Sequence, residues 1–260
     1  MTIIDTHCHL YAKEFEDDIA TVIKRAQQLG VKQFYLPNID SKSIDSMLKM
    51  EIDFPDACIA MMGLHPCSVK EDYKRELAIV ESWLQKRAFA AVGEIGLDFY
   101  WDKTFVDQQY EAFHQQIIWA EQYNLPIVIH TREAMQQCID VVAQHKTEKL
   151  SGIFHCFGGN VDEAKQIIDL GFYLGIGGVL TYKKSGLKET LKEIDIKHLV
   201  LETDAPYLTP VPFRGKRNES AYLQYVIQVL AEVKNLTVEE VAAVTTANAN
   251  FVFQKRQHVA

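Results

Sequence analysis

Paired cysteines, an excess of basic charge and long apolar runs are all missing from this 260-residue chain, and each shortage excludes a class of protein. The five cysteines are scattered and form no Cys-x-x-Cys pair, which argues against a disulfide framework and against a zinc ribbon. The formal net charge is -8, whereas proteins held on nucleic acid by a basic surface need clustered Lys and Arg. A phosphodiester substrate remains open, because bound metal cations can supply positive charge locally.

Targeting and membrane segments are also missing from the pattern. No apolar run is long enough to span a bilayer, and the first residues lack a basic region followed by an apolar one. Together with the cysteine usage, this predicts a cytoplasmic protein in a reducing compartment, with no membrane partner. No linker-like or low-complexity stretch interrupts the sequence, so we expect residues 1–260 to form a single domain.

Short apolar runs alternate with amphipathic stretches along the whole chain. We expect strands at 2–7, 31–39, 57–64, 89–95, 126–130, 152–157, 172–177 and 198–202. We expect helices at 17–29, 41–50, 73–86, 105–123, 133–145, 161–170, 184–194, 221–233 and 237–247. Three local signals support these boundaries: Gly30 as a C-cap, Ser41 as an N-cap, and a capping box of Thr237 with Glu240.

The alternation predicts the fold class. Strands this apolar are buried on both faces, as in a parallel sheet covered by helices. Eight β-then-α units in about 250 residues are typical of an α/β protein with a (β/α)8 TIM barrel. The alternative is an open doubly wound sheet, which normally carries a glycine fingerprint after its first strand. This chain has His7-Cys8-His9 at that position, which favours the barrel.

Potential metal ligands gather at the ends of the expected strands. His7 and His9, spaced i, i+2, lie on one face if the chain is extended there. Later strands end in, or carry near their ends, His65, Glu94, His130, His155 and Asp204. Because the carboxyl ends of barrel strands meet at one mouth, we expect these side chains to converge.

Each of these residues taken alone has an ordinary structural interpretation. A carboxylate at a strand end is often a helix N-cap, and a histidine in a strand is often a hydrogen-bonded core residue. The set as a whole, in register with the strand ends, favours a metal centre over these alternatives.

The number of ligands indicates two metals. The set of His7, His9, Glu94, His130, His155 and Asp204 exceeds the three protein ligands of a catalytic zinc. We therefore predict that Glu94 bridges two divalent ions. In this prediction His7, His9 and Asp204 hold one ion, and His130 with His155 holds the other.

The same segments resemble a known family. The chain contains DTHCH at 5–9, GLHP at 63–66, GEIGLD at 93–98, PIVIHTR at 126–132, HCFGG at 155–159, ETDAPYL at 202–208 and RGKRNE at 214–219. In this order the segments are similar to the TatD family of metal-dependent deoxyribonucleases, within the amidohydrolase superfamily. Two departures are Ala205, where the family often has Ser, and Ser220, where Pro is common. Neither position is a candidate ligand.

The resemblance implies a barrel, a divalent-metal centre and hydrolysis of DNA phosphodiester bonds. The family's metal ligands map onto the same six residues named above. We accordingly expect two divalent ions (Mg, Zn or Mn), single-stranded DNA as the substrate, and a monomer or weak oligomer.

Several residues have expected roles in this chemistry. Glu94 and Asp204 are the expected catalytic residues, with Asp204 binding metal and accepting the proton of the attacking water. His65 and Arg132 are expected to hold the phosphate, since Arg offers a planar fork of donors.

Two further clusters keep two interpretations each. The basic residues Arg214, Lys216 and Arg217 either guide a polyanion to the mouth or form a solvated loop. The aromatic run 99–101 either stacks bases or covers the barrel rim.

Two alternative functions stay open. The first is an amidohydrolase-type enzyme that acts on a small amide, lactone or phosphoester at the same centre. Many such relatives bridge their metals with a modified lysine on the fourth strand, so Glu94 favours the nuclease branch. The second is a non-enzymatic metal-binding or scaffold protein, which predicts a site closed to water. Ligands around an open barrel mouth argue against it.

Overall fold

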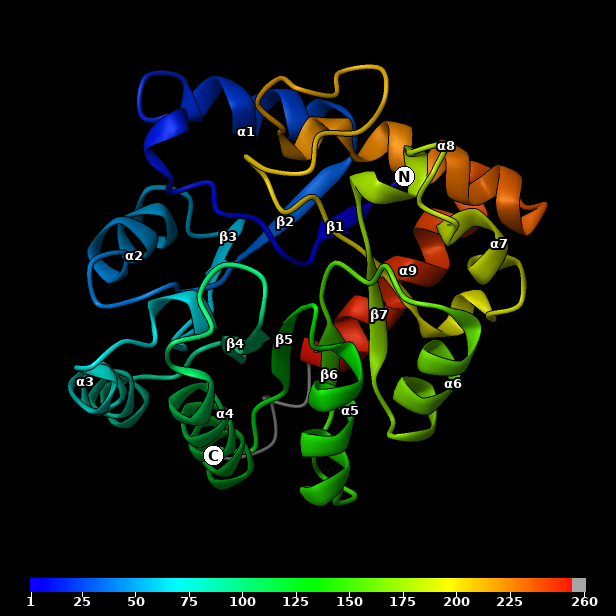
Figure 1. The fold of residues 1–260 in the computed structure, drawn as a ribbon. Coiled ribbons are helices and arrows are strands. Elements are labelled where there is room, and N and C mark those ends of the chain that lie inside the picture. Colours follow the sequence, from blue (N-terminus) through cyan, green and yellow to red (C-terminus); the bar gives the residue numbers. More distant parts are fainter. Residues whose placement is uncertain (254–260) are drawn as a thin grey trace.

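A computed structural model describes residues 1–253, in which strands and helices alternate as the sequence pattern predicts (Figure 1). The strands are β1 (Ile3–Asp5), β2 (Val31–Leu36), β3 (Cys58–Ala60), β4 (Val92–Asp98), β5 (Ile127–Arg132), β6 (Gly152–Phe154), β7 (Tyr173–Ile176) and β8 (Leu199–Leu201). The α-helices are α1 (Ile19–Gln28), α2 (Ile44–Asp53), α3 (Tyr73–Lys86), α4 (Val106–Gln122), α5 (Met135–Gln144), α6 (Val161–Asp169), α7 (Leu187–Lys192), α8 (Leu223–Lys234) and α9 (Val238–Phe253). Short 3₁₀ helices are η1 (Lys13–Phe15), η2 (Pro66–Ser68), η3 (Gly178–Thr181), η4 (Ile196–His198) and η5 (Ser220–Tyr222).

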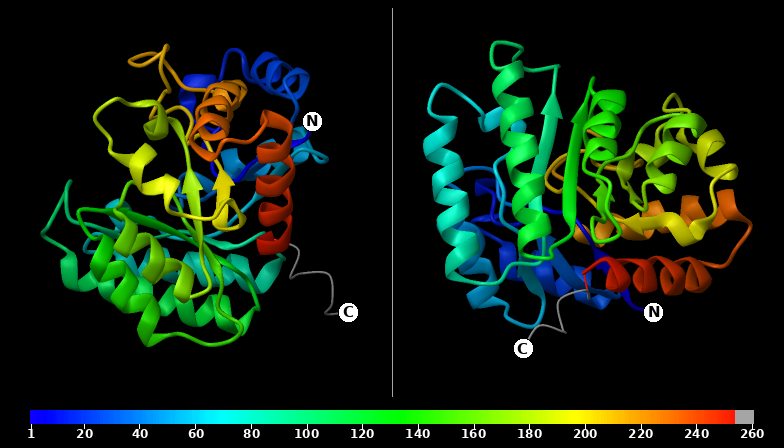
Figure 2. Two further views of the ribbon diagram at one scale, coloured as in Figure 1. Left: turned by 90° about the vertical axis from the view of Figure 1, so that its right-hand side faces the viewer. Right: turned by 90° about the horizontal axis from the view of Figure 1, so that it is seen from below.

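The strands form a (β/α)8 barrel, as the sequence predicts, built from two parallel sheets. One sheet has the order β1-β2-β3 and the other the order β4-β5-β6-β7-β8. A bridge between Met62 and Val92 joins the sheets on one side. On the other side the backbone N–H of Thr6 donates to the carbonyl of Leu201 at 3.0 Å. The helices lie outside the strands in the views of Figure 2.

Helix α9 lies across one end of the strands (Figures 1 and 2). Its residues Val252 and Phe253 pack in one buried cluster with Ile4, Val128 and other strand residues. The ring of Phe253 stacks on Tyr35, with the ring centroids 3.8 Å apart. This packing closes the end of the barrel that the amino ends of the strands reach, so the opposite end is the one left for a site.

The local signals predicted two of three helix boundaries. Gly30 follows the end of α1 with φ +96°, the left-handed conformation typical of a residue just after a helix. Thr237 and Glu240 form the reciprocal hydrogen bonds of a capping box before α9. The prediction for Ser41 is wrong, because α2 begins later, at Ile44. The Ser41 hydroxyl instead donates to Glu76 of α3 at 2.8 Å.

Strand β4 begins and ends three residues later than its predicted range of 89–95. Its pairing with β5 continues to Asp98, which lies opposite Arg132, so this ladder extends the strand beyond the apolar run. The register shifts between Gly93 and Ile95, which is a bulge at Glu94. Glu94 therefore lies inside β4 and not at its end as expected, and a bulge of this kind re-aims a side chain.

Two structural findings concern the expectations about membrane segments and about the single domain. The helices within residues 1–253 all lack the combination of length and apolar character that a membrane crossing requires. The expected domain, 1–260, includes residues 254–260, which lie outside the described part of the chain.

Close backbone approach at the start of β6 gives a prediction for stability. A Cβ on Gly152 would lie 1.9 Å from the carbonyl oxygen of Ile127, and this backbone oxygen cannot move without disturbing β5. Gly152→Ala should lower the free energy of unfolding by roughly 1–3 kcal/mol or more through overpacking. Urea unfolding followed by circular dichroism measures it.

The control is Gly158→Ala, where the nearest atom to the added Cβ is 4.0 Å away. Equal urea midpoints for both variants and the wild type would contradict the strand packing described here.

Candidate metal centre

The six predicted ligands converge around the carboxylate of Glu94, as the barrel geometry predicts. Oxygen Oε2 faces the two histidines after β1, at 3.1 Å from His7 Nε2 and 3.6 Å from His9 Nε2. Oxygen Oε1 faces His130 Nδ1 at 2.8 Å and His155 Nε2 at 3.3 Å. Each oxygen of Glu94 thus faces a different set of imidazoles, which is the arrangement expected of a bridging carboxylate.

The burial of Glu94 makes its ionisation depend on these neighbours. Its side chain is only 2% exposed, and burial raises the pKa of the carboxyl. Interactions with His65, His7 and His155, with a hydrogen bond from His130, outweigh burial and hold the pKa well below its usual range. Glu94 is therefore a carboxylate at neutral pH, as a metal ligand must be.

Asp204 closes the other side of the cluster. Its Oδ1 lies 3.4 Å from His9 Nε2 and 3.8 Å from His7 Nε2. Burial raises its pKa, but the interactions with His9, His155 and His7 lower it below the usual range overall. With 15% of its side chain exposed against 2% for Glu94, Asp204 is the carboxylate that solvent reaches more easily.

Asp204 is held in place through β1. Its backbone N–H donates to the carbonyl of His7 at 2.9 Å. Two residues before His7, the buried carboxylate of Asp5 accepts hydrogen bonds from the backbone and hydroxyl of Thr203 and from the Ser220 hydroxyl. Burial raises the pKa of Asp5 to about 7, although these bonds oppose the shift. This network fastens the loop after β8 to the strand that carries His7 and His9.

A hydrogen bond on the outer side of the His9 ring decides which of its nitrogens faces the centre. The Tyr11 hydroxyl donates to the carbonyl of Pro37, so its oxygen accepts from Nδ1 of His9 at 2.9 Å. His9 in its neutral form therefore turns the lone pair of Nε2 toward Glu94 and Asp204. A ring nitrogen with a free lone pair is what a metal ligand requires.

Carboxylates lie on the outer side of two other histidines. Asp98 Oδ2 lies 2.9 Å from Nε2 of His130, and Nδ1 of this ring faces Glu94. Glu202 Oε1 lies 3.2 Å from Nδ1 of His155 as an ion-pair contact, and Nε2 of this ring faces Glu94. Such carboxylate–histidine pairs orient metal ligands and raise their basicity.

The sequence alone predicts no role for Tyr11, Asp98 and Glu202. Asp98 and Glu202 stand at or next to a strand end, as the predicted ligands do, and this position was a signal available for both. For Tyr11 no comparable signal exists, because its partner Pro37 lies in the loop after β2.

His65 differs from the predicted ligands in its tautomer. Its Nδ1 accepts the backbone N–H of Cys67 at 3.0 Å, so the proton of the neutral ring lies on Nε2. Burial lowers its pKa below the usual value of 6.5, although the nearby Glu94 opposes this, so the ring is neutral. Nε2 lies 3.3 Å from Glu94 Oε1. His65 therefore presents a donor N–H to the centre, which agrees with its predicted role in holding a phosphate.

The donor atoms fit divalent cations. Three overlapping groups each bring their atoms within 4.8 Å of one another: His7, His155 and Asp204; His7, His9 and Glu94; His65, Glu94 and His130. His155 stacks on His7 with ring centroids 3.7 Å apart, so the two predicted ligand sets touch each other as well as Glu94. Buried carboxylates and imidazole nitrogens gathered this closely are stabilised by bound cations, which displace protons from the ligand nitrogens.

Arg132 is the predicted site residue that the structure does not bring into this cluster. It is exposed at the end of β5, two residues after His130, and its guanidinium lies over the ring of Tyr100. Among the basic residues after β8, Arg217 forms a two-pronged ion pair with Asp18 and is thus structural. Arg214 lies over the ring of Tyr182 and remains exposed.

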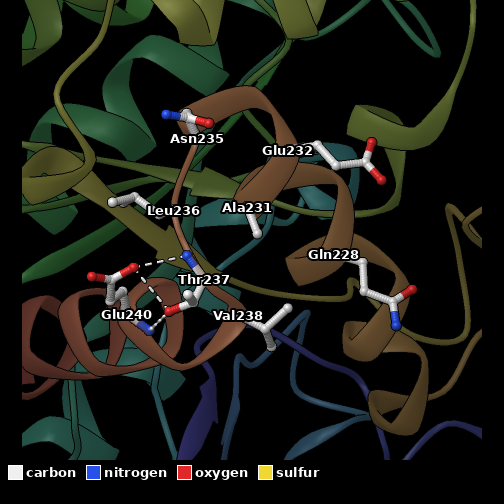
Figure 3. A pocket seen from close by; sticks show the side chains of 8 residues that line it. All are labelled: Gln228, Ala231, Glu232, Asn235, Leu236, Thr237, Val238 and Glu240. Carbon is white, nitrogen blue, oxygen red and sulfur yellow. Dashed lines mark hydrogen bonds between the residues drawn. The ribbon is translucent and has the colours of Figure 1, made fainter.

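Two pockets lie in different parts of the structure. One lies between the end of α8 and the start of α9 (Figure 3) and contains none of the candidate ligands. Its Thr237 and Glu240 bond each other in the capping box, which explains its polar lining. The other lies between the loops after β5 and β6 and is lined by Arg132, Met135 and Cys156 among others. Cys156 directly follows the candidate ligand His155 in the sequence.

Comparison with known proteins gives a consistent result over the whole chain. Residues 4–254 match the model of a family described as TatD related DNase. The uncharacterized metal-dependent hydrolase YabD of Bacillus subtilis is 39% identical, over 97% of this chain and 99% of that protein. The uncharacterized metal-dependent hydrolase YcfH of Escherichia coli is 31% identical, over 95% and 94%.

A solved structure shows the same architecture. The crystal structure of YjjV, a TatD homologue from Escherichia coli, superposes with a TM-score of 0.92 at 28% identity. The match covers 97% of this chain and 98% of that one. The likeness confirms the barrel and the predicted family resemblance.

The contact between Asp98 and His130 gives a prediction for metal affinity. Asp98→Asn removes the charge that orients His130 and keeps an amide oxygen to accept the loop N–H groups. We expect a loss of roughly 10–100-fold in metal affinity. Calorimetric titration of EDTA-treated protein with Mn²⁺ measures it.

The matched control is Asp102→Asn, in the same loop, where the carboxylate pairs with Lys70 and touches no histidine within residues 1–253. Wild-type affinity in Asp98→Asn would remove its role as a positioning residue.

The protonation of the histidines predicts how metal binding depends on pH. For His130 and His155 burial lowers the pKa, but Asp98 and Glu94 for the first, and Glu202 and Glu94 for the second, raise it above 6.5 overall. Both rings thus retain a proton that a metal ion must displace. Mn²⁺ affinity should therefore increase as the pH rises above that value.

Affinity measured between about pH 6 and about pH 9, in buffers with different ionisation enthalpies, tests this. Constant affinity without proton release would contradict it.

Proposed function

We propose that this chain, which belongs to the TatD family of metal-dependent hydrolases, is a deoxyribonuclease that cleaves phosphodiester bonds at its barrel mouth. The observation that carries the proposal is Glu94, whose two oxygens face two sets of imidazoles beside a second carboxylate, Asp204. Two-metal sites of this composition suit the displacement of an oxygen from a phosphate. We further propose single-stranded DNA as the substrate, a cytoplasmic location, and a monomer or weak oligomer.

The residues that would hold the ions are the six predicted ones. His7, His9 and Asp204 would hold one ion, His130 and His155 the other, with Glu94 between them. When bound, the ions supply Lewis acidity and positive charge for the phosphate oxygens. Imidazole suits zinc and carboxylate suits magnesium or manganese, so this mixed set admits all three metals.

Side chains of the protein have the other proposed roles in the reaction. Asp204 is the proposed general base, because its lowered pKa keeps it ionised and it is the more exposed carboxylate. An Oδ of Asp204 would take the proton of the attacking water. His65 would donate its Nε2–H to a phosphate oxygen, since Nδ1 is occupied by the Cys67 N–H. Arg132 would add a guanidinium on the side of the mouth formed by β5.

The test is cleavage of end-labelled single-stranded DNA by purified protein with Mg²⁺, Mn²⁺ or Zn²⁺. Wild-type protein should cleave, and Asp204→Asn should lower the rate by roughly 100-fold or more, because the amide cannot accept a proton. Circular dichroism checks that the variant is folded.

Asp140→Asn is the control, since this exposed aspartate lies on α5 away from the cluster and contacts Gln136. A parallel panel of small phosphoesters, lactones and amides tests the alternative substrate classes. Absence of DNA cleavage with every metal, combined with turnover of a small substrate, would replace the proposal by the amidohydrolase alternative.

A further inference from the structure

Two exposed aromatic rings and an exposed guanidinium lie together on the rim next to the metal cluster. We propose that Tyr100, Trp101 and Arg132, called here the rim platform, form a stacking subsite for one unpaired nucleobase of the bound strand. This inference rests on the proposed function and extends it, because it assigns a place to the base beside the phosphate at the centre.

The three side chains form one surface. The Arg132 guanidinium carbon lies 4.2 Å from the centroid of the Tyr100 ring and 5.5 Å from that of Trp101. The two rings meet edge to face, with centroids 4.9 Å apart and an interplanar angle of 86°. Tyr100 is 49% exposed and Trp101 is 68% exposed, so ring surface remains available for another planar group.

Only the first residue of the aromatic run 99–101 has the alternative role of covering the barrel rim. Phe99 packs against the main hydrophobic core and lies near the ring of Tyr110. Tyr100 and Trp101 do not take part in that packing and remain exposed. Burial of aromatic surface is favourable, so two adjacent exposed rings indicate a surface that a ligand covers.

Asp98 ties the rim platform to the metal centre. Its Oδ1 accepts the backbone N–H groups of Tyr100 and Trp101 at 2.9 and 3.0 Å. Its Oδ2 holds Nε2 of His130, as described above. Arg132 comes two residues after His130 and pairs in register with Asp98. The position of the rings relative to a predicted ligand is thus set before any substrate binds, which reduces the entropy lost on binding.

Charge favours a nucleotide as the occupant. Some arginines of this acidic chain pair with carboxylates, as Arg25 does with Glu219, whereas Arg214, like Arg132, lies over an aromatic ring. Within residues 1–253 Arg132 has no acidic partner, and Glu133 beside it lies 3.9 Å from Lys103. Arg132 also lines the pocket between the loops after β5 and β6. An unpaired planar cation on an aromatic ring suits both a base face and a nearby phosphate.

The shape of the rim platform selects the form of nucleic acid. Stacking on exposed rings needs a free base face, which a base inside a duplex does not offer. Stacking is also tolerant of sequence, because every base has such a face. The rim platform therefore predicts a preference for single strands with little preference among bases.

The test is binding of a fluorescent oligothymidylate, measured by anisotropy in Ca²⁺, with the oligonucleotide checked on a gel to be intact. Trp101→Ala should weaken binding roughly 5–100-fold, and Trp101→Phe should retain most of the affinity. Phe251→Ala is the matched control, because this ring is 61% exposed but lies on α9 at the closed end of the barrel. Arg132→Lys should weaken binding although it keeps the charge.

An oligonucleotide of the same length with an abasic backbone shows whether Trp101 acts on the base. Wild-type protein should bind the abasic strand about as weakly as Trp101→Ala binds oligothymidylate, and Trp101→Ala should lose little more on the abasic strand. Additive losses, or wild-type affinity in Trp101→Ala, would overturn the subsite. Because binding is measured without turnover, failure of the nuclease proposal appears separately, as absence of cleavage by wild-type protein that still binds the strand.

Discussion

A carboxylate buried among five imidazoles is the interaction on which this molecule depends. Glu94 lies within 3.6 Å of a ring nitrogen of five histidines: His7, His9, His65, His130 and His155. A buried charge is tolerated only when partners compensate it, so this carboxylate constrains how the surrounding strands pack. The bulge in β4 at Glu94 belongs to the same constraint, because it departs from the regular ladder where the side chain must reach the histidines.

A second layer of contacts decides what each histidine can do. Tyr11, Asp98 and Glu202 lie at the outer nitrogens of three rings, and the other nitrogen of each ring faces inward. For His65 the outer partner is a backbone donor, so its inward nitrogen carries the proton. One residue type thereby supplies both candidate ligands and a hydrogen-bond donor, and the difference comes from the partner of each outer nitrogen.

The loops outside the centre extend this organisation to the surface. Asp98 contacts both His130 and the backbone of the aromatic run, so one carboxylate links metal ligation with the rim. On the other side of the mouth, Asp5 fastens the loop that carries Asp204 to β1. Both links join residues distant in the chain, and both place them to within a hydrogen-bond length. Such rigid positioning is what a reacting centre requires.

The sequence by itself determined the barrel and the convergence of the candidate ligands. Apolar runs of strand length reveal β-strands, and in a barrel all carboxyl ends of strands share one mouth, so residues from His7 to Asp204 had to meet. It did not determine that Ser41, before α2, bonds Glu76 of α3, that β4 extends to Asp98, or which nitrogen of His130 faces inward. Only the tertiary structure decided these, because each depends on a partner far along the chain whose distance no local pattern encodes.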